Sequence, residues 1–171
     1  RFHFRKFTLH TKVVLTTTAV LLAAGTVLLQ LTDGIGWLAA FFHSTSARTA
    51  GFSTVSMGDL SDAGLFVLII LMFIGASPGS TGGGIKTSTF FVLFQSVRST
   101  FTKKQIGAFK RGISAKTVST ASSITILSLA VVCLGTFFMC VLEPEYNFIQ
   151  LLFEVISAFG TVGLSTGITP D

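Results

Sequence analysis

TAGFST at residues 49–54 recurs, with two substitutions, as TVGLST at residues 161–166. The two stretches share Thr, Gly, Ser and Thr in the same order, at a constant offset of 112 residues. Each follows a short apolar segment, Ile35–Ser46 or Phe148–Phe159. A helix of about 12 residues covers about 18 Å, whereas the hydrocarbon core of a bilayer is about 30 Å thick. Each short helix and its loop are therefore predicted to enter a membrane and return without crossing it.

The composition indicates a membrane protein. Hydrophobic residues make up 50% of the 171 residues and charged residues 11%, against about 25% charged residues in a typical soluble domain. The net charge of +5 is also found in nucleic-acid-binding proteins, but here the basic residues are not interleaved with aromatic ones. We therefore expect membrane lipids, and no nucleic acid, among the partners. Cys133 and Cys140 lie seven residues apart in an apolar segment, which indicates packed thiols rather than a metal-ligand pair.

Three longer segments predict membrane-spanning helices: Val13–Leu31, Ala63–Val97 and Thr117–Leu142. The middle one would measure about 52 Å as a continuous helix, which is well beyond the thickness of the core. Its centre reads GASPGSTGGGIK at residues 75–86, where Pro78 and five glycines oppose a regular helix. We expect the helix to break there, inside the membrane.

These segments predict an all-α integral membrane protein. Its repeated units would each contain a transmembrane helix, a pore helix, a filter loop and a second transmembrane helix, and the glycine-rich loop would break that second helix. We expect a first unit at residues 1–100, a basic cytoplasmic linker at residues 101–116, and a second unit at residues 117–171 without its final helix. At the offset of 112 residues, Phe41 of the first short helix falls on Phe153 of the second.

The charges are distributed unevenly along the chain. Ten of the twelve Lys and Arg residues precede the first span or lie at residues 98–116, and the positive-inside rule places both segments in the cytoplasm of a multi-pass protein of the cell membrane. All seven acidic residues then fall on the opposite half, around the two loops. We expect the loops to face the outside, beneath a vestibule whose negative charge attracts cations.

A glycine-centred backbone run placed twice at membrane depth is typical of an ion-selectivity filter, because backbone carbonyls can replace the water around a cation. We expect the ion-binding carbonyls to belong to the first four residues of each loop. These residues are Thr49, Ala50, Gly51, Phe52, Thr161, Val162, Gly163 and Leu164. The C-terminal ends of the two short helices would direct partial negative charge toward the same cavity.

Two basic residues, Arg48 and Lys86, fall outside the two basic segments. Arg48 directly precedes the first loop, and we expect it to pair with an acid such as Glu154. Lys86 lies in the broken second span. A cation held near the pore would repel a permeating cation unless it moved or paired, which favours a role in gating. The alternative is a side chain that snorkels to the cytoplasmic edge.

Other function classes fit the residues less well. GSTGGGIKT at residues 79–87 is close to a phosphate-binding loop, but Lys86 comes one residue too late for that motif. No carboxylate and nucleophile stand at a catalytic spacing from His43, and we expect this residue to cap the end of its short helix. The sequence therefore predicts no enzyme and no catalytic residue. A membrane scaffold or non-conducting subunit is the alternative function, ahead of a nucleotide-binding membrane ATPase.

Three stretches together resemble the Trk/Ktr/HKT superfamily of potassium translocators, closest to the bacterial KtrB-type membrane subunit. They are ARTAGFST at residues 47–54, GASPGSTGGGIKT at residues 75–87 and FGTVGLSTG at residues 159–167. In that superfamily four repeats surround one pore, with one glycine in each filter. The resemblance places those glycines at Gly51 and Gly163, and it covers the third repeat in full and the fourth up to its filter.

The resemblance implies potassium uptake across the cell membrane by a pore-forming subunit, with K⁺ bound by the filter carbonyls and the glycine-rich loop acting as a gate. The expected gate residues are Gly75, Gly79, Gly82, Gly83, Gly84 and Lys86. No cofactor is expected in this chain, and Na⁺ is a candidate coupling or activating ion. The implied partners are the remaining repeats of the same translocator, a second copy in a homodimer, and a cytosolic nucleotide-binding regulatory ring (KtrA/TrkA-like) docked on the basic residues at 98–116.

Overall fold

A computed structural model describes residues 7–102, 107–108 and 111–168. Its elements follow in the order α1 (Leu9–Asp33), α2 (Trp37–Ser46), the 3₁₀ turn η2 (Met57–Asp59), α3 (Asp62–Phe73), α4 (Thr87–Thr102), β1 (Gly107–Ala108), β2 (Arg111–Gly112), α5 (Ala115–Leu142) and α6 (Phe148–Phe159). The predicted segments are helical, and the predicted break in the second long segment separates α3 from α4. The described elements are all helices apart from one short hairpin. Strands β1 and β2 pair antiparallel where the chain reverses direction between α4 and α5.

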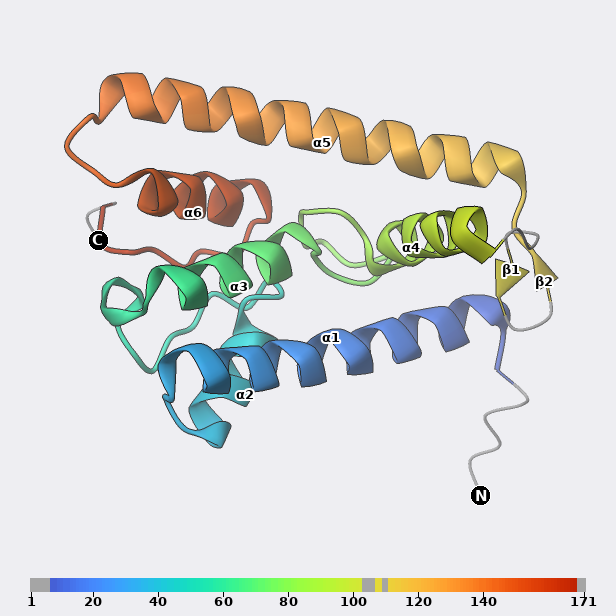
Figure 1. Cartoon of the computed structure of the whole chain (residues 1–171), viewed down its shortest axis with the longest axis horizontal. Coiled ribbons are helices and arrows are strands. Elements are labelled where there is room, and N and C mark those ends of the chain that lie inside the picture. Colours follow the sequence, from blue (N-terminus) through green and yellow to red (C-terminus); the bar gives the residue numbers. More distant parts are fainter. Residues whose placement is uncertain (1–6, 103–106, 109–110, 169–171) are drawn as a thin grey trace.

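The described elements form an elongated bundle (Figure 1). Helices α1 and α5 run along its length, and α3 and α4 lie between them, one after the other. The short helices α2 and α6 lie toward one end, whereas β1 and β2 lie at the other end. At about 1.5 Å per residue, α1 and α5 measure about 37 and 42 Å, which is enough to cross a bilayer core. Among the described helices, these two are long and apolar enough to span a membrane.

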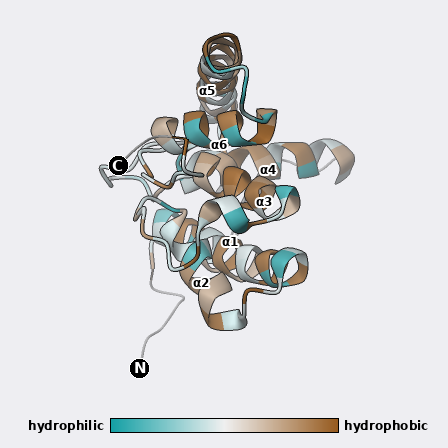
Figure 2. Ribbon diagram, turned by 90° about the vertical axis from the view of Figure 1, so that its left-hand side faces the viewer, coloured by the Kyte–Doolittle hydropathy of each residue, from teal (hydrophilic) through white to brown (hydrophobic). Residues whose placement is uncertain are grey.

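The protein core surrounds α3, which lies between α1 and α6 in the end-on view of Figure 2. Leu65, Leu68 and Met72 of α3 are buried against apolar side chains of both neighbours, including Leu29 of α1 and Phe153 of α6. Helix α5 differs, because only 11% of its most apolar 18-residue stretch is buried inside the protein. Its surface therefore suits contact with lipid or with further protein, whereas α3 is an internal helix.

Gly25 of α1 lets α2 and α3 approach α1 closely. A Cβ at this position would lie 2.5 Å from Ser44 Oγ of α2 and 2.6 Å from a terminal carbon of Leu71 of α3. The Ser44 hydroxyl is held in place by its hydrogen bond to the Leu22 carbonyl of α1, at 3.1 Å. The contact among the three helices therefore depends on the missing side chain.

We predict that Gly25→Leu lowers the free energy of unfolding by about 1–3 kcal/mol, because the added side chain overpacks this contact. The measurement is the thermal unfolding midpoint of the detergent-solubilised protein. Gly112→Ala serves as the control, since a Cβ at Gly112 would meet nothing within 4 Å. An unchanged midpoint for the Gly25 variant would show that α1 does not pack on α2 and α3 in this way.

Candidate functional site

The loops that follow α2 and α6 share an unusual backbone conformation. Thr49 and Gly51 have φ angles of 91° and 74°, and Thr161 and Gly163 have φ angles of 52° and 89°. Among the described residues, Thr49 and Thr161 are the only non-glycine residues with positive φ. A β-branched residue is strained in this region, at a cost of about 1–3 kcal/mol, and such strain clusters at functional sites. The same strain at matching positions marks both loops as a candidate site.

The two loops lie against each other although they are far apart in the sequence. A Cβ on Gly51 would overlap the Val162 carbonyl oxygen, so only glycine allows this approach. Gly163 differs, because a Cβ there would meet nothing within 4 Å. The structure thus brings together the predicted residues 49–51 and 161–163, with one glycine required for contact and the other facing open space.

Six backbone carbonyls in these loops accept no hydrogen bond from any described residue. They belong to Thr49, Ala50, Gly51, Thr161, Val162 and Gly163. A backbone carbonyl that accepts no hydrogen bond from the protein is free to bind water or a ligand. A carbonyl oxygen is also a ligand that a desolvated alkali cation accepts in place of water.

The fourth residue of each loop is bound differently from the first three. The Ser46 hydroxyl donates to the Phe52 carbonyl, and the Ser157 hydroxyl donates to the Leu164 carbonyl at 2.6 Å. Serines of α2 and α6 thus tie the loops to their own helices. We did not single out these two serines from the sequence, although a small hydroxyl residue in the last turn of each short helix was a usable signal.

The constant offset of 112 residues does not extend into the short helices. The serine and the carbonyl that it binds are six residues apart in the first loop and seven apart in the second. Phe41 and Phe153, which the offset aligns, also occupy different environments, because Phe41 is 51% exposed and Phe153 is fully buried. The two repeats therefore resemble each other more in the backbone conformation of their loops than in the side-chain environments of their short helices.

Two side-chain expectations are wrong. The ring of His43 does not cap its helix, because its Nε2 atom lies 3.2 Å from the Thr54 hydroxyl at the end of the first loop. Arg48 does not pair with Glu154. Its guanidinium donates to the Gly75 carbonyl at 3.3 Å, while Glu154 accepts hydrogen bonds from its own loop. Arg48 therefore links the first loop to the glycine-rich segment.

The glycine-rich loop, residues 75–86, lies against both strained loops. A Cβ on Gly82 would come within 2.7 Å of the Thr49 side chain. The Gly83 N–H donates to the Thr161 hydroxyl at 2.8 Å, and a Cβ on Gly83 would lie 2.6 Å from the Phe159 carbonyl oxygen. Glycine at both positions therefore lets the glycine-rich loop approach its neighbours more closely than a residue with a side chain could.

The glycine-rich loop is also held together internally. A Cβ on Gly75 would overlap the Gly83 carbonyl, and a Cβ on Gly84 would lie 3.0 Å from the Gly75 nitrogen. Lys86 donates from Nζ to the Ser80 carbonyl at 3.3 Å and to the Gly82 carbonyl. Its ammonium group is thus paired with carbonyls of its own loop. Gly79 takes no part in these contacts. Its φ angle is 87°, and a Cβ at this position would have no atom within 4 Å.

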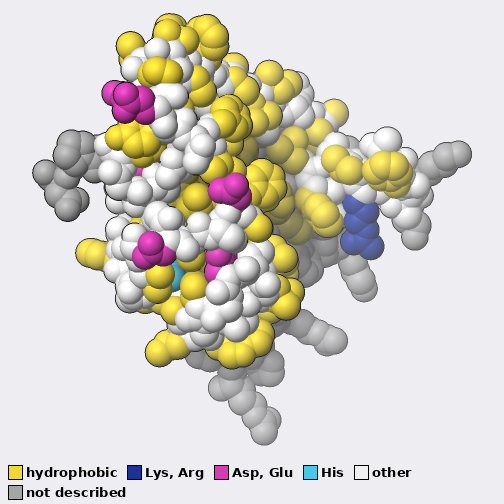
Figure 3. Space-filling view, turned by 60° about the vertical axis from the view of Figure 1, so that its left-hand side comes forward, with side chains coloured by type: hydrophobic (Ala, Val, Ile, Leu, Met, Phe, Trp, Pro, Cys, Tyr) yellow, Lys and Arg dark blue, Asp and Glu magenta, His cyan; other side chains and the backbone are white. Residues whose placement is uncertain are grey.

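Charge is separated along the bundle. Figure 3, which brings the α2 and α6 end forward, shows the Asp and Glu side chains there, with Lys or Arg side chains toward the far end. Among the described residues, no group of three His, Cys, Asp or Glu residues could hold a metal ion.

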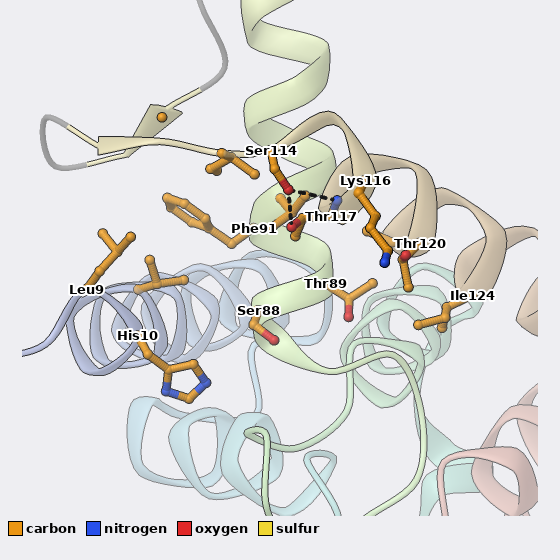
Figure 4. Close-up of a pocket in the computed structure, with 15 residues that line it drawn as sticks. Leu9, His10, Ser88, Thr89, Phe91, Ser114, Lys116, Thr117, Thr120 and Ile124 are labelled. Carbon is orange, nitrogen blue, oxygen red and sulfur yellow. Dashed lines mark hydrogen bonds between the residues drawn. The ribbon is translucent and has the colours of Figure 1, made fainter.

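A cavity of about 770 Å³ lies away from the strained loops, among the first turns of α1, α4 and α5 (Figure 4). Its lining is mainly apolar, with Leu9, Phe91 and Ile124 from the three helices. Lys116 adds one cation near the start of α5, where Ser114 caps the helix by accepting a bond from the Thr117 N–H at 3.3 Å. This cavity contains none of the strained loop residues and is separate from the candidate site.

Comparison with known proteins gives one family and several relatives. The TrkH family, described as cation transport protein, matches residues 4–171. The chain is 42% identical to Ktr system potassium uptake protein B of Vibrio alginolyticus, over 99% of this chain and 40% of that protein. It is 37% identical to the protein of the same name from Bacillus subtilis and to potassium/sodium uptake protein NtpJ of Enterococcus hirae, over 98% of this chain and 40% of each relative. The chain thus spans about 40% of the length of these relatives.

Proposed function

This chain belongs to the TrkH family of cation transport proteins, and on that premise we propose that it forms part of the pore of a potassium uptake system in the cell membrane. The observation that carries the proposal is the set of six unpaired carbonyls on two strained loops in mutual contact. The relatives named as potassium uptake proteins support K⁺ as the ion. No catalytic activity and no cofactor form part of this proposal.

The loops would bind K⁺ by replacing its water with backbone oxygens. Residues 49–51 and 161–163 would each supply one side of a short filter. Helices α2 and α6 both end at these loops, so the partial negative charge of their C-terminal ends favours a cation that is losing its water. Two loops cannot surround an ion, and the remaining repeats of the longer translocator would complete the ring. A homodimer of such subunits is the expected assembly.

The charge separation supports an orientation for the pore. We place the N-terminal segment and residues 98–116 in the cytoplasm and the strained loops toward the outside, in line with the positive-inside rule. Acidic residues at the outer end would raise the local concentration of cations. The basic linker is the proposed docking surface for a cytosolic nucleotide-binding regulatory ring, and Na⁺ is the proposed coupling or activating ion.

The glycine-rich loop is the proposed gate. It contacts both filter loops, through Thr49 and Thr161, so its movement would change the space directly beside the ion-binding carbonyls. Lys86 supports a closed resting state, because its ammonium group holds the loop by binding two of the loop's own carbonyls. Breaking these two hydrogen bonds would allow the loop to move and would leave the Lys86 ammonium group without its carbonyl partners.

The two filter glycines should respond differently to serine. Gly51→Ser places a side chain onto the Val162 carbonyl and should abolish K⁺ uptake by the complete gene product. Gly163→Ser meets no steric barrier but strains a left-handed residue by about 1–2 kcal/mol, and it should reduce the preference for K⁺ over Na⁺ without abolishing uptake.

The measurement is uptake of K⁺ and Na⁺ by potassium-transport-deficient cells that express each variant, normalised to the amount of inserted protein. Gly112→Ala is the matched glycine control, since its site lies in the linker hairpin away from the loops. If both serine variants keep the wild-type ratio of K⁺ to Na⁺ uptake, the two loops are not the filter. If both lose the same amount of K⁺ uptake, the predicted difference between Gly51 and Gly163 is wrong.

The gate can be tested by locking the glycine-rich loop to the first filter loop. We predict that a Thr49→Cys/Gly82→Cys pair forms a disulfide under mild oxidation, because a Cβ on Gly82 would lie against the Thr49 side chain. Cys133 and Cys140, which are free thiols, are first replaced by alanine. Oxidation should block K⁺ uptake and a reducing agent should restore it. Each single cysteine variant is the control, and full uptake through a cross-linked protein would contradict the gate.

A further inference from the structure

The second filter loop is fastened by a carboxylate, and we propose that Glu154 is a positioning residue that sets the preference for K⁺ over Na⁺. This inference rests on the proposed function of the two loops. Glu154 lies on α6 and was expected from the sequence to neutralise Arg48, a contact that the structure does not contain. Its carboxylate instead holds the residues that directly follow Leu164.

Three donors converge on one oxygen of this carboxylate. Glu154 Oε1 accepts from the Ser165 hydroxyl at 2.8 Å, from the Thr166 N–H at 2.7 Å and from the Thr166 hydroxyl at 3.0 Å. Hydrogen bonds to an ionised acceptor are shorter and about twice as strong as those between neutral groups. The end of the second filter loop is thus tied to α6 by three hydrogen bonds to one carboxylate oxygen.

The same helix also fastens the start and middle of this loop. The Val162 N–H donates to the Ser157 carbonyl at 2.9 Å, and the Ser157 hydroxyl donates to the Leu164 carbonyl at 2.6 Å. Helix α6 is itself well anchored, with Phe153 and Ile156 buried in the core. Gly163, between these attachments, is therefore placed by what holds its neighbours.

Packing does little to hold Gly163 in place. A Cβ there would meet nothing within 4 Å, and a cavity of about 550 Å³ is lined by both sides of the loop, from Val162 to Ser165, together with Glu154 and Met139 of α5. At Gly163 itself, the hydrogen bonds to the loop and the burial of Val162 and Leu164 on either side therefore decide the positions of the carbonyls. Selection between K⁺ and Na⁺ depends on the spacing or the field strength of those oxygens, so a looser attachment would weaken it.

Within the described part of the chain, no equivalent carboxylate binds the first loop. Its corresponding link is the single contact of 3.2 Å between His43 Nε2 and the Thr54 hydroxyl, and there Gly51 is packed against Val162. Among the described residues, the end of the first loop is therefore held by a histidine and the end of the second by a carboxylate. We expect selectivity to be more sensitive to Glu154 than to His43.

The test compares Glu154→Ala and Glu154→Gln in the complete gene product reconstituted into liposomes, with K⁺ and Na⁺ uptake measured as apparent affinity and maximal rate. We expect the alanine variant to lose about tenfold of its preference for K⁺, equivalent to about 1.4 kcal/mol, with a smaller effect on maximal rate. The glutamine variant keeps the shape and one acceptor oxygen, and it should lose about threefold, or about 0.65 kcal/mol.

A second pair of variants separates positioning from general charge. Thr166→Val removes one donor to the carboxylate, and in the Glu154→Ala background it should have no further effect, because the two residues act through one contact. Glu145→Gln removes a charge from an exposed residue in the turn before α6 and should change the preference by less than about twofold.

Preservation of the K⁺ preference in Glu154→Ala would overturn the inference while leaving the filter assignment intact. An equal loss in Glu145→Gln would also overturn it, because the effect would then come from charge at the pore mouth. If Glu154→Ala fails to insert, the glutamine variant decides, and a preference equal to that of the wild type would contradict the inference. Absence of K⁺ uptake by the wild-type protein would overturn the proposed function and this inference with it.

Discussion

Backbone polar groups that lie away from water must find partners, and this constraint organises the structure around the three non-helical segments near its centre. The loops after α2 and α6 and the glycine-rich loop between α3 and α4 meet one another. Serine hydroxyls, the Arg48 guanidinium and the Lys86 ammonium satisfy part of their carbonyls. Six carbonyls of the two strained loops accept no hydrogen bond from the described residues, and these are the groups proposed to bind the ion.

The contacts among the three segments suggest why glycine is needed at particular positions. Gly51 and Gly82 each lie where a side chain would collide with another loop, and Gly83 lies against the end of α6. Close approach of this kind couples the glycine-rich loop to both strained loops at once. A movement of the glycine-rich loop would therefore directly displace the backbone proposed to bind the ion, and no change in the positions of the helices would be needed.

Much of the fold could be predicted from the sequence because the bilayer limits which segment lengths are useful. Val13–Leu31 lies within α1, Phe148–Phe159 is α6, and the glycine-rich stretch separates α3 from α4, as Pro78 and its neighbouring glycines require. The side-chain partners were harder. Arg48 and His43 find their partners through the packing of loops distant in the sequence, and the unequal serine spacing shows that the repeat is not strict in α2 and α6. Periodicity and spacing contain no information on such contacts.

The central claim is that residues 49–51 and 161–163 bind a potassium-like cation through their carbonyl oxygens. The most direct measurement is anomalous X-ray diffraction from crystals of the complete protein in which K⁺ is replaced by Rb⁺. We predict an anomalous peak coordinated by the carbonyls of Gly51 and Gly163. A peak held by acidic side chains at the outer end, with none between the two loops, would contradict it.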